Sequence, residues 1–399
     1  MRYDFDRVLS RRNTNCEKWD DVESLFGEQD VLPMWVADMD MPVAQPITDA
    51  LRKRIEHPIY GYALSRPPSV AEAVQLRMRQ KYGWQVEPEW IVFTPGIVPA
   101  LYAAVKAYTH PGDEVILQGP VYYRFWTAIT DNGCQVANNR LQLVRGRYEI
   151  DFDDLEAKFA PKADLRASPS RVRMMLLCNP HNPVGRVWTR EELLRIGEIV
   201  IRHGAIILSD EVFGELLFHQ ARHIPFASLS DEFAQHSIVC ISPSKAFNLS
   251  GLGASAIIIP NARLRQRFLE AKQGIMPWVN VLGLVAFEAA FREGDEWLEQ
   301  FLAYLHGNLA FALEYFAQNI PRIKVIPPEG TYLLWLDCRE LGLDPMHLRT
   351  FLRKEAKVAL DDGYLFGPSG AGFQRMNIAC PRSILVEALQ RIEKAVNSL

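Results

Sequence analysis

The chain has 399 residues, of which 48% are hydrophobic and 23% charged, and its formal net charge is −4. A chain of this length is too long for one ordinary hydrophobic core and suits two domains. The basic stretches are short and lie at helical spacing, which argues against a nucleic-acid partner. No hydrophobic run approaches the roughly 20 residues that span a bilayer, so we expect no membrane partner.

The N-terminus and the cysteines indicate a cytoplasmic protein. The first seven residues alternate charged and aromatic side chains and lack the hydrophobic centre of a signal peptide. The six cysteines are scattered and show no CxxC spacing, which is the pattern of redox and zinc motifs. We therefore expect a reducing, cytoplasmic setting and no metal cofactor.

Short hydrophobic runs in the middle of the chain each end at a polar or Gly/Pro-rich loop. These runs are residues 90–93, 114–117, 174–177, 205–208 and 237–241. Continuous hydrophobic strands that alternate with helices indicate a parallel sheet buried on both faces. Ligands bind beyond the carboxyl ends of such strands, so we expect loops that are distant in sequence to meet at one site.

From about residue 320 the pattern changes to an α+β module. Its predicted elements are antiparallel strands over 323–326 and 332–336 on either side of a Pro-Pro-Glu-Gly turn, a helix over 346–357, a strand over 373–378 and a final helix from about 383. A helical stretch around 297–319 connects this module to the sheet. We predict an α/β fold in which residues 46–290 form the large domain, while 1–45 and 291–399 form the small one.

Two polar positions that follow buried strands are candidates for holding a cofactor. Lys245 comes just after a predicted strand, where burial lowers the pKa of an amine enough for imine formation. The hydroxyls of Ser242 and Ser244 suit a phosphate. Asp210 also follows a strand, and its carboxylate would keep a pyridine nitrogen protonated. Taken alone, Lys245 is equally well a surface lysine, and Asp210 fits a helix N-cap better.

Further candidates lie in neighbouring loops. Asn182 belongs to a rigid Asn-Pro-His-Asn-Pro-Val-Gly loop, and its amide could donate to a ring hydroxyl. A helix begins after Gly96, so the backbone N–H groups of Ile97 and Val98 offer a phosphate site. Tyr122 follows a Gly-Pro step and could stack on an aromatic cofactor. Turn formation, an ordinary helix start and a core tyrosine explain these residues without a ligand, and a lone glycine at a helix start is weak evidence for a phosphate site.

Together and in this order, the motifs resemble the fold-type I, aspartate-aminotransferase-like enzymes that use pyridoxal 5′-phosphate (PLP). The spacing from Asn182 to Asp210 is 28 residues and that from Asp210 to Lys245 is 35, and both suit that superfamily. A closer resemblance, to the cystathionine β-lyase/cystalysin group of C–S lyases, covers the whole chain. The segments that carry it are 19–20, 32–40, 61–62, 120–123, 182–188, 242–248, 329–332 and 372–377.

The resemblance assigns roles to the candidate residues. It implies that Lys245 holds PLP as a Schiff base, that Asp210 and Asn182 contact the ring, and that Tyr122 stacks on it. Arg375 would bind the substrate α-carboxylate, for which a planar guanidinium is well suited.

Two tyrosines gain a role only through the resemblance. Tyr123 would assist proton transfer near Lys245. Tyr62 would reach the phosphate of the neighbouring subunit's cofactor, which makes the enzyme a homodimer. Without the resemblance, Arg375 is better explained as a surface charge and Tyr62 as a buried aromatic.

The implied reaction is β-elimination from L-cystathionine or a related cysteine S-conjugate, which yields pyruvate, ammonia and a thiol. Two positions depart from related enzymes. Phe213 stands where these lyases commonly carry His and aminotransferases Tyr, and it cannot hydrogen-bond the ring hydroxyl. Gly253 stands where aminotransferases usually place a phosphate-binding Arg, which favours a lyase. The alternatives are a PLP-dependent aminotransferase and an inactive PLP-fold protein with a regulatory or binding role.

Overall fold

The computed structural model describes residues 1–28, 30–160, 172–218 and 221–399. Within these residues the larger sheet has seven strands in the order β2-β10-β9-β8-β7-β3-β4. Their bounds are β2 (Ile91–Thr94), β10 (Ser255–Ile258), β9 (Ser237–Ile241), β8 (Ile206–Asp210), β7 (Val172–Cys178), β3 (Glu114–Leu117) and β4 (Gln135–Asn138). Strands β9, β8, β7, β3 and β4 run parallel, whereas β10 is antiparallel to both of its neighbours. The mostly parallel sheet predicted from the hydrophobic runs is confirmed.

Two strands of this sheet were not predicted. Strand β4 lies at the edge, where several of its residues remain accessible, so no continuous hydrophobic run marks it. Strand β10 is buried and four residues long, like the predicted strands β2 and β3, so its length does not explain why it was missed.

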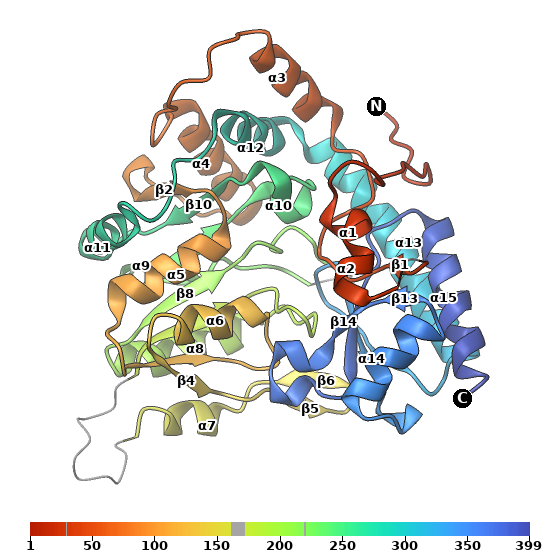
Figure 1. Cartoon of the computed structure of the whole chain (residues 1–399). Coiled ribbons are helices and arrows are strands. Elements are labelled where there is room, and N and C mark those ends of the chain that lie inside the picture. Colours follow the sequence, from red (N-terminus) through yellow and green to blue (C-terminus); the bar gives the residue numbers. More distant parts are fainter. Residues whose placement is uncertain (29, 161–171, 219–220) are drawn as a thin grey trace.

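Helices cover both faces of the larger sheet (Figure 1). One face packs against α5 (Ile97–Tyr108), α6 (Tyr123–Thr130) and α11 (Ala262–Lys272). The opposite face packs against α8 (Arg190–Arg202) at one end and against α4 (Pro68–Tyr82) and α12 (Val281–Glu293) at the other. The remaining helices of this region are α3 (Gln45–Ile55), α7 (Phe152–Ala157), α9 (Asp231–Gln235) and α10 (Pro243–Ala246).

Helix α8 shows how local sequence sets these elements. Thr189 and Glu192 form a capping box at its start, in which each side chain accepts from the other residue's backbone N–H. Leu193, Ile196 and Val200 follow at helical spacing and are completely buried. The helix therefore begins at a specified residue and presents one hydrophobic face to the sheet.

The C-terminal module is built around a four-stranded antiparallel sheet of order β11-β12-β15-β14. The strands are β11 (Lys324–Ile326), β12 (Leu333–Asp337), β15 (Phe373–Asn377) and β14 (Asp361–Asp362), and the helices are α13 (Asp295–Asn319), α14 (Pro345–Lys354) and α15 (Arg382–Val396). The predicted antiparallel pair is confirmed as β11 and β12, with Val325 opposite Leu336.

The N-terminal segment contacts the C-terminal module. Strand β1 (Leu32–Pro33) pairs in parallel with β13 (Val358–Ala359). The short helices α1 (Glu17–Asp20) and α2 (Val22–Phe26) lie beside this pair (Figure 1). Strands β5 (Gln142–Val144) and β6 (Arg147–Glu149) form a separate antiparallel hairpin. We propose that residues 46–290 form one structural unit and that 1–45 together with 291–399 form the other.

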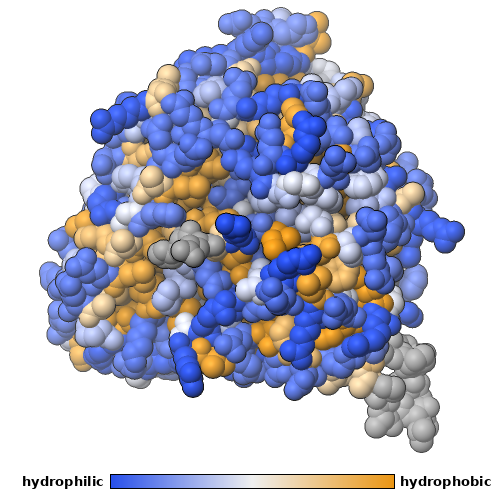
Figure 2. All heavy atoms as spheres, turned by 180° about the vertical axis from the view of Figure 1, so that it is seen from behind, coloured by the Kyte–Doolittle hydropathy of each residue, from blue (hydrophilic) through white to orange (hydrophobic). Residues whose placement is uncertain are grey.

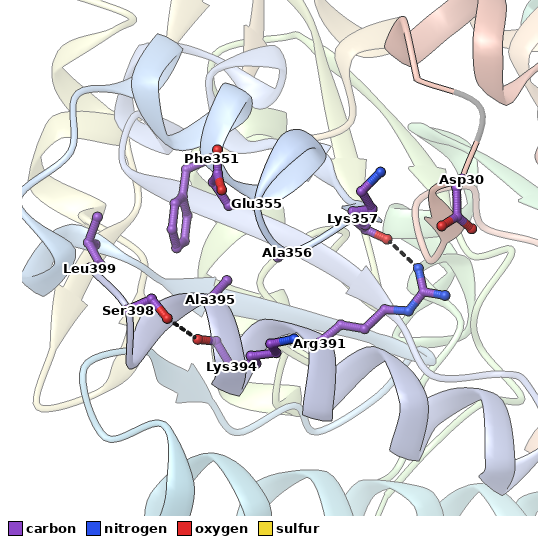
Figure 3. Close-up of a pocket in the computed structure, with 10 residues that line it drawn as sticks. All are labelled: Asp30, Phe351, Glu355, Ala356, Lys357, Arg391, Lys394, Ala395, Ser398 and Leu399. Carbon is purple, nitrogen blue, oxygen red and sulfur yellow. Dashed lines mark hydrogen bonds between the residues drawn. The ribbon is translucent and has the colours of Figure 1, made fainter.

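Charged and polar residues cover most of the face seen from behind in Figure 2, with smaller hydrophobic areas between them. None of the helices in the described ranges is long and apolar enough to cross a membrane. A cavity of about 590 Å³ lies on the C-terminal module between α14 and α15 (Figure 3). Arg391 spans it and donates to the carbonyl oxygen of Lys357 over 3.1 Å. This cavity contains none of the candidate residues.

Candidate functional site

A second cavity, of about 400 Å³, lies beyond the carboxyl ends of β7, β8 and β9. Nine of the eleven candidate residues line it: Ile97, Val98, Tyr122, Tyr123, Asn182, Asp210, Ser244, Lys245 and Arg375. They come from the starts of helices α5, α6 and α10, from loops, and from strands of both sheets. The expectation that loops after successive parallel strands meet at one site is therefore confirmed.

Lys245 lies in α10, directly after β9. Its Nζ donates to the carbonyl oxygen of Ala37 over 2.7 Å and lies 3.4 Å from Ser250 Oγ. Although its side chain borders the cavity, it is enclosed by protein, and this burial lowers its pKa to about 8 despite the opposing charge of Asp38. A substantial fraction of the amine is therefore neutral near neutral pH and available as a nucleophile or base.

Asp210 ends β8 with its carboxylate buried. No helix starts there, so the N-cap interpretation is wrong; Oδ1 instead accepts from the backbone N–H of Val212 over 3.2 Å. Burial raises the pKa of Asp210 to about 7, and the neighbouring Glu211 adds to this effect. A buried carboxylate whose pKa is raised in this way is stabilised by a nearby cation, and a protonated pyridine nitrogen is such a cation.

Arg375 lies on β15 and is buried, so the interpretation as a surface charge is wrong. One Nη donates to Asn182 Oδ1 over 3.1 Å, and the other donates to the carbonyl oxygen of Trp35 over 3.0 Å and pairs with Asp361. Its Nε is buried and, within the described ranges, has no hydrogen-bond partner. Since the Asn182 oxygen is already engaged, its amide N–H groups are the ones left to donate to a ligand.

The rest of the cavity wall combines a helix start with aromatic side chains. Helix α5 begins after Gly96 without a side-chain cap, so its first N–H groups face the cavity as an anion site. The rings of Tyr122 and Tyr123 lie 4.6 Å apart between centroids, and burial raises the pKa of Tyr122. Phe213 packs edge-on against Tyr332 at 5.6 Å.

Gly253 also lines the cavity, and its conformation explains its identity. Its φ is +51°, and a Cβ there would lie 2.9 Å from the carbonyl oxygen of Pro95. Any side chain at this position is therefore strained, and an arginine would need a different local backbone.

Two candidate residues lie outside this cavity. Ser242 Oγ donates to the carbonyl oxygen of Ala254 over 2.8 Å and accepts from the N–H of Ser244, which caps α10. Tyr62 is 95% exposed and has a ring contact with Trp278. It lies in a group of exposed hydrophobic side chains that comprises its sequence neighbours Ile59, Tyr60 and Leu64 together with Ile275 and Trp278, and Leu64 and Trp278 line one cavity.

Neither Asp361 nor the carbonyl oxygen of Ala37 was predicted from the sequence to be a site group. Ala37 lies in the segment 32–40 that carried the family resemblance, so a motif signal was present. Asp361 lies on a strand of two residues, which gives no periodicity to detect.

The cavity residues fit PLP in charge and in hydrogen-bonding capacity. A lysine of lowered pKa, an under-compensated buried carboxylate and an uncapped helix start match its aldehyde, ring nitrogen and phosphate, respectively. Within the described residues, no group of three or more His, Cys, Asp or Glu side chains is placed to hold a metal ion.

Comparisons with known proteins agree with this chemistry. The family model "Aminotransferase class I and II" matches residues 33–392. Cystathionine beta-lyase PatB of Bacillus subtilis is 42% identical over 98% of this chain and 100% of its own length. Protein MalY of Escherichia coli is 30% identical, with both chains fully covered.

Solved structures similar to this chain include enzymes that contain PLP. Cystalysin of Treponema denticola, which contains PLP, superposes with a TM-score of 0.94 at 35% identity and full coverage of both chains. The PLP-bound C–S lyase of Staphylococcus hominis superposes with a TM-score of 0.91 at 31% identity, covering 99% of this chain and 98% of its own.

Proposed function

The chain belongs to the aminotransferase class I and II family, and we propose that it is a PLP-dependent C–S lyase acting on L-cystathionine or a related cysteine S-conjugate. The observation that carries this proposal is the convergence of Lys245, Asp210 and Arg375 on one cavity. The similarity to cystathionine β-lyases and C–S lyases supports elimination over transamination. Gly253 also supports elimination over transamination, because its backbone leaves no room for the phosphate-binding arginine of aminotransferases.

When bound, PLP supplies an aldehyde for the substrate amine and an electron sink for the pair released at Cα. Arg375 binds the α-carboxylate through its unpaired Nε–H, which orients the Cα–H bond. Lys245, neutral in large part near pH 8, takes the Cα proton as general base. The Cβ–S bond breaks, the sulfur leaves as a thiolate that is then protonated, and addition of water yields pyruvate and ammonia.

Three residues hold the cofactor ring in this scheme. Asp210 would provide the negative charge that keeps the ring nitrogen protonated, and Asn182 would donate to the ring hydroxyl. Tyr122 stacks on the ring, while Tyr123, 36% exposed at the edge of the cavity, assists proton transfer near Lys245.

The test is product release by the purified holoenzyme from L-cystathionine with no 2-oxo acid added. Equal amounts of pyruvate and free thiol are expected, and Lys245→Ala should abolish both because the base is lost. Turnover that requires 2-oxoglutarate would instead identify an aminotransferase. A protein with no borohydride-sensitive absorbance near ~420 nm, the expected cofactor band, would be an inactive scaffold.

We further propose a homodimer in which Tyr62 contacts the phosphate of the partner's cofactor. The exposed hydrophobic group around Tyr62 and Trp278 supports this, because such a patch commonly marks a subunit contact. The six cysteines are all free, which supports a reducing cytoplasmic location.

Mixed dimers test the role of Tyr62. Tyr62→Ala should bind PLP more weakly, and Lys245→Ala is inactive. A dimer that combines the two variants carries one intact site only if the site is shared between subunits. After the variants are unfolded and refolded together, about a quarter of wild-type activity is expected, because about half of the dimers are mixed and each has one good site. No gain over the separately refolded variants would exclude a shared site.

A further inference from the structure

Asp361 places a second carboxylate at the group that binds the substrate α-carboxylate. It lies on β14 opposite Arg375 of β15, lines the cavity and pairs through Oδ2 with the guanidinium. Within the described ranges, its Oδ1 has no hydrogen-bonding partner, and the side chain is 14% exposed. Burial raises the pKa of Asp361 above its ordinary value, although Arg375 opposes this.

The adjacent carboxylate is arranged differently. Asp362 points away from the cavity, accepts from Arg353 over 2.8 Å and from Gln374 over 3.1 Å, and is also buried. Arg353, the other cation that acts on Asp361, forms its ion pair with Asp362. Asp361 depends on Arg375 for its compensating charge.

A bound amino acid changes this balance of charge. The buried, unpaired Nε–H of Arg375 is the donor left for an α-carboxylate. Once that carboxylate binds, the Arg375 guanidinium is paired with two negative groups, the substrate α-carboxylate and Asp361. Lys245 acts as a neutral base, so it does not compensate the excess negative charge. A buried carboxylate without a full partner is costly, and a positive group on the ligand removes that cost.

We propose that Asp361 is a specificity-determining residue that selects cysteine S-conjugates whose S-substituent carries an ammonium group. This inference rests on the proposed lyase function, since it names the class of leaving group for the same site. The free Oδ1 accepts from that ammonium in the cavity. Neutral and anionic substituents of the same size bind less well, because they leave the excess charge in place or add to it.

Binding of two amino acids that cannot be cleaved tests the selection separately from the chemistry. L-ornithine and L-norleucine have the same chain length and differ in an ammonium against a methyl terminus, and neither has a leaving group at Cβ. Dissociation constants are measured on the PLP-loaded enzyme from the change in cofactor absorbance. We expect ornithine to bind on the order of tenfold more tightly than norleucine to the wild type.

The variants locate the effect. In Asp361→Asn the tenfold ratio should fall to about one, in Asp361→Glu most of it should return, and in the matched control Asp362→Asn it should stay as in the wild type. Circular dichroism melts identify any variant that does not fold. The inference is overturned if the wild type does not prefer ornithine, or if Asp361→Asn keeps the wild-type preference. If Asp361→Asn does not fold, the ratio of the two dissociation constants in the wild type and in Asp361→Glu tests the inference instead.

Pyruvate release separates this inference from the function beneath it. S-(2-aminoethyl)-L-cysteine should give a higher kcat/KM than S-propyl-L-cysteine, whose substituent has the same number of heavy atoms, and Asp361→Asn should bring the two close together. Pyruvate from both conjugates at equal efficiency refutes the selection but leaves the lyase intact. Pyruvate from neither, nor from L-cystathionine, refutes the lyase itself, even if ornithine still binds more tightly than norleucine.

Discussion

Replacing Asp210 with asparagine should make the cofactor-free protein more stable while weakening its hold on PLP. Burial raises the pKa of this carboxyl from an ordinary value of 3.8 to about 7. The folded chain therefore retains a proton between these pH values that the unfolded chain has released. Stability contributed by this group consequently falls as pH rises from about 4 to about 7 and stays low above that.

The size of the effect follows from the pKa difference. At about 1.4 kcal/mol per pKa unit, the ionised Asp210 destabilises the apoprotein by at most about 4 kcal/mol above pH 7. The unfolding entropy expected for 399 residues is about 0.8 kcal/mol/K, so this corresponds to about 5 °C in Tm. Asparagine has nearly the same shape and no charge, and it removes the penalty.

The assay is thermal unfolding of cofactor-free wild type and Asp210→Asn at pH 5 and pH 8. The variant should unfold at a higher temperature at pH 8, with a smaller difference at pH 5. Its dissociation constant for PLP at pH 8 should rise by tenfold or more, because the ring nitrogen loses its carboxylate. Asp153→Asn, at a fully exposed position, serves as the control and should show neither effect. A difference in Tm that is the same at both pH values would refute the argument.

Two further substitutions probe the substrate and the ring. Arg375→Lys should raise KM for S-conjugates by about 10- to 100-fold with a smaller change in kcat, because lysine has no Nε–H at the place where the α-carboxylate binds. Steady-state pyruvate assays measure both constants, and a loss confined to kcat would contradict carboxylate binding. Phe213 lines the cavity, so Phe213→Tyr adds a hydrogen-bond donor beside the cofactor ring. Because a donor favours the ionised ring oxygen, the pH midpoint of the cofactor's absorbance change should fall. An unchanged midpoint in a spectral pH titration would mean that the new hydroxyl does not reach the ring.

Much of the site was open to prediction because its signals are local. An aspartate ends one buried strand, a lysine and an asparagine each follow another by a few residues, and parallel strands end at a common edge. Lys245, Asp210 and Asn182 therefore had to meet once the strands were recognised. The antiparallel pair of β11 and β12 was likewise visible from a turn between two hydrophobic runs.

Other features depend on contacts between distant segments. The N-cap interpretation of Asp210 failed because the chain turns after β8 instead of entering a helix, and the surface interpretation of Arg375 failed because β15 lies inside its sheet. The Ala37 carbonyl that holds Lys245 is 208 residues away from it in sequence. No periodicity marks such a contact.

By itself, the sequence determined the parallel sheet, the order of the loop motifs and the identity of the lysine. Only the tertiary structure decided the charge state of the site: it buries Asp210 without a cation and pairs Arg375 with Asp361. The physical reason is that hydrophobic pattern and turn chemistry act over a few residues. Desolvation and charge pairing, in contrast, depend on every segment that packs around a group.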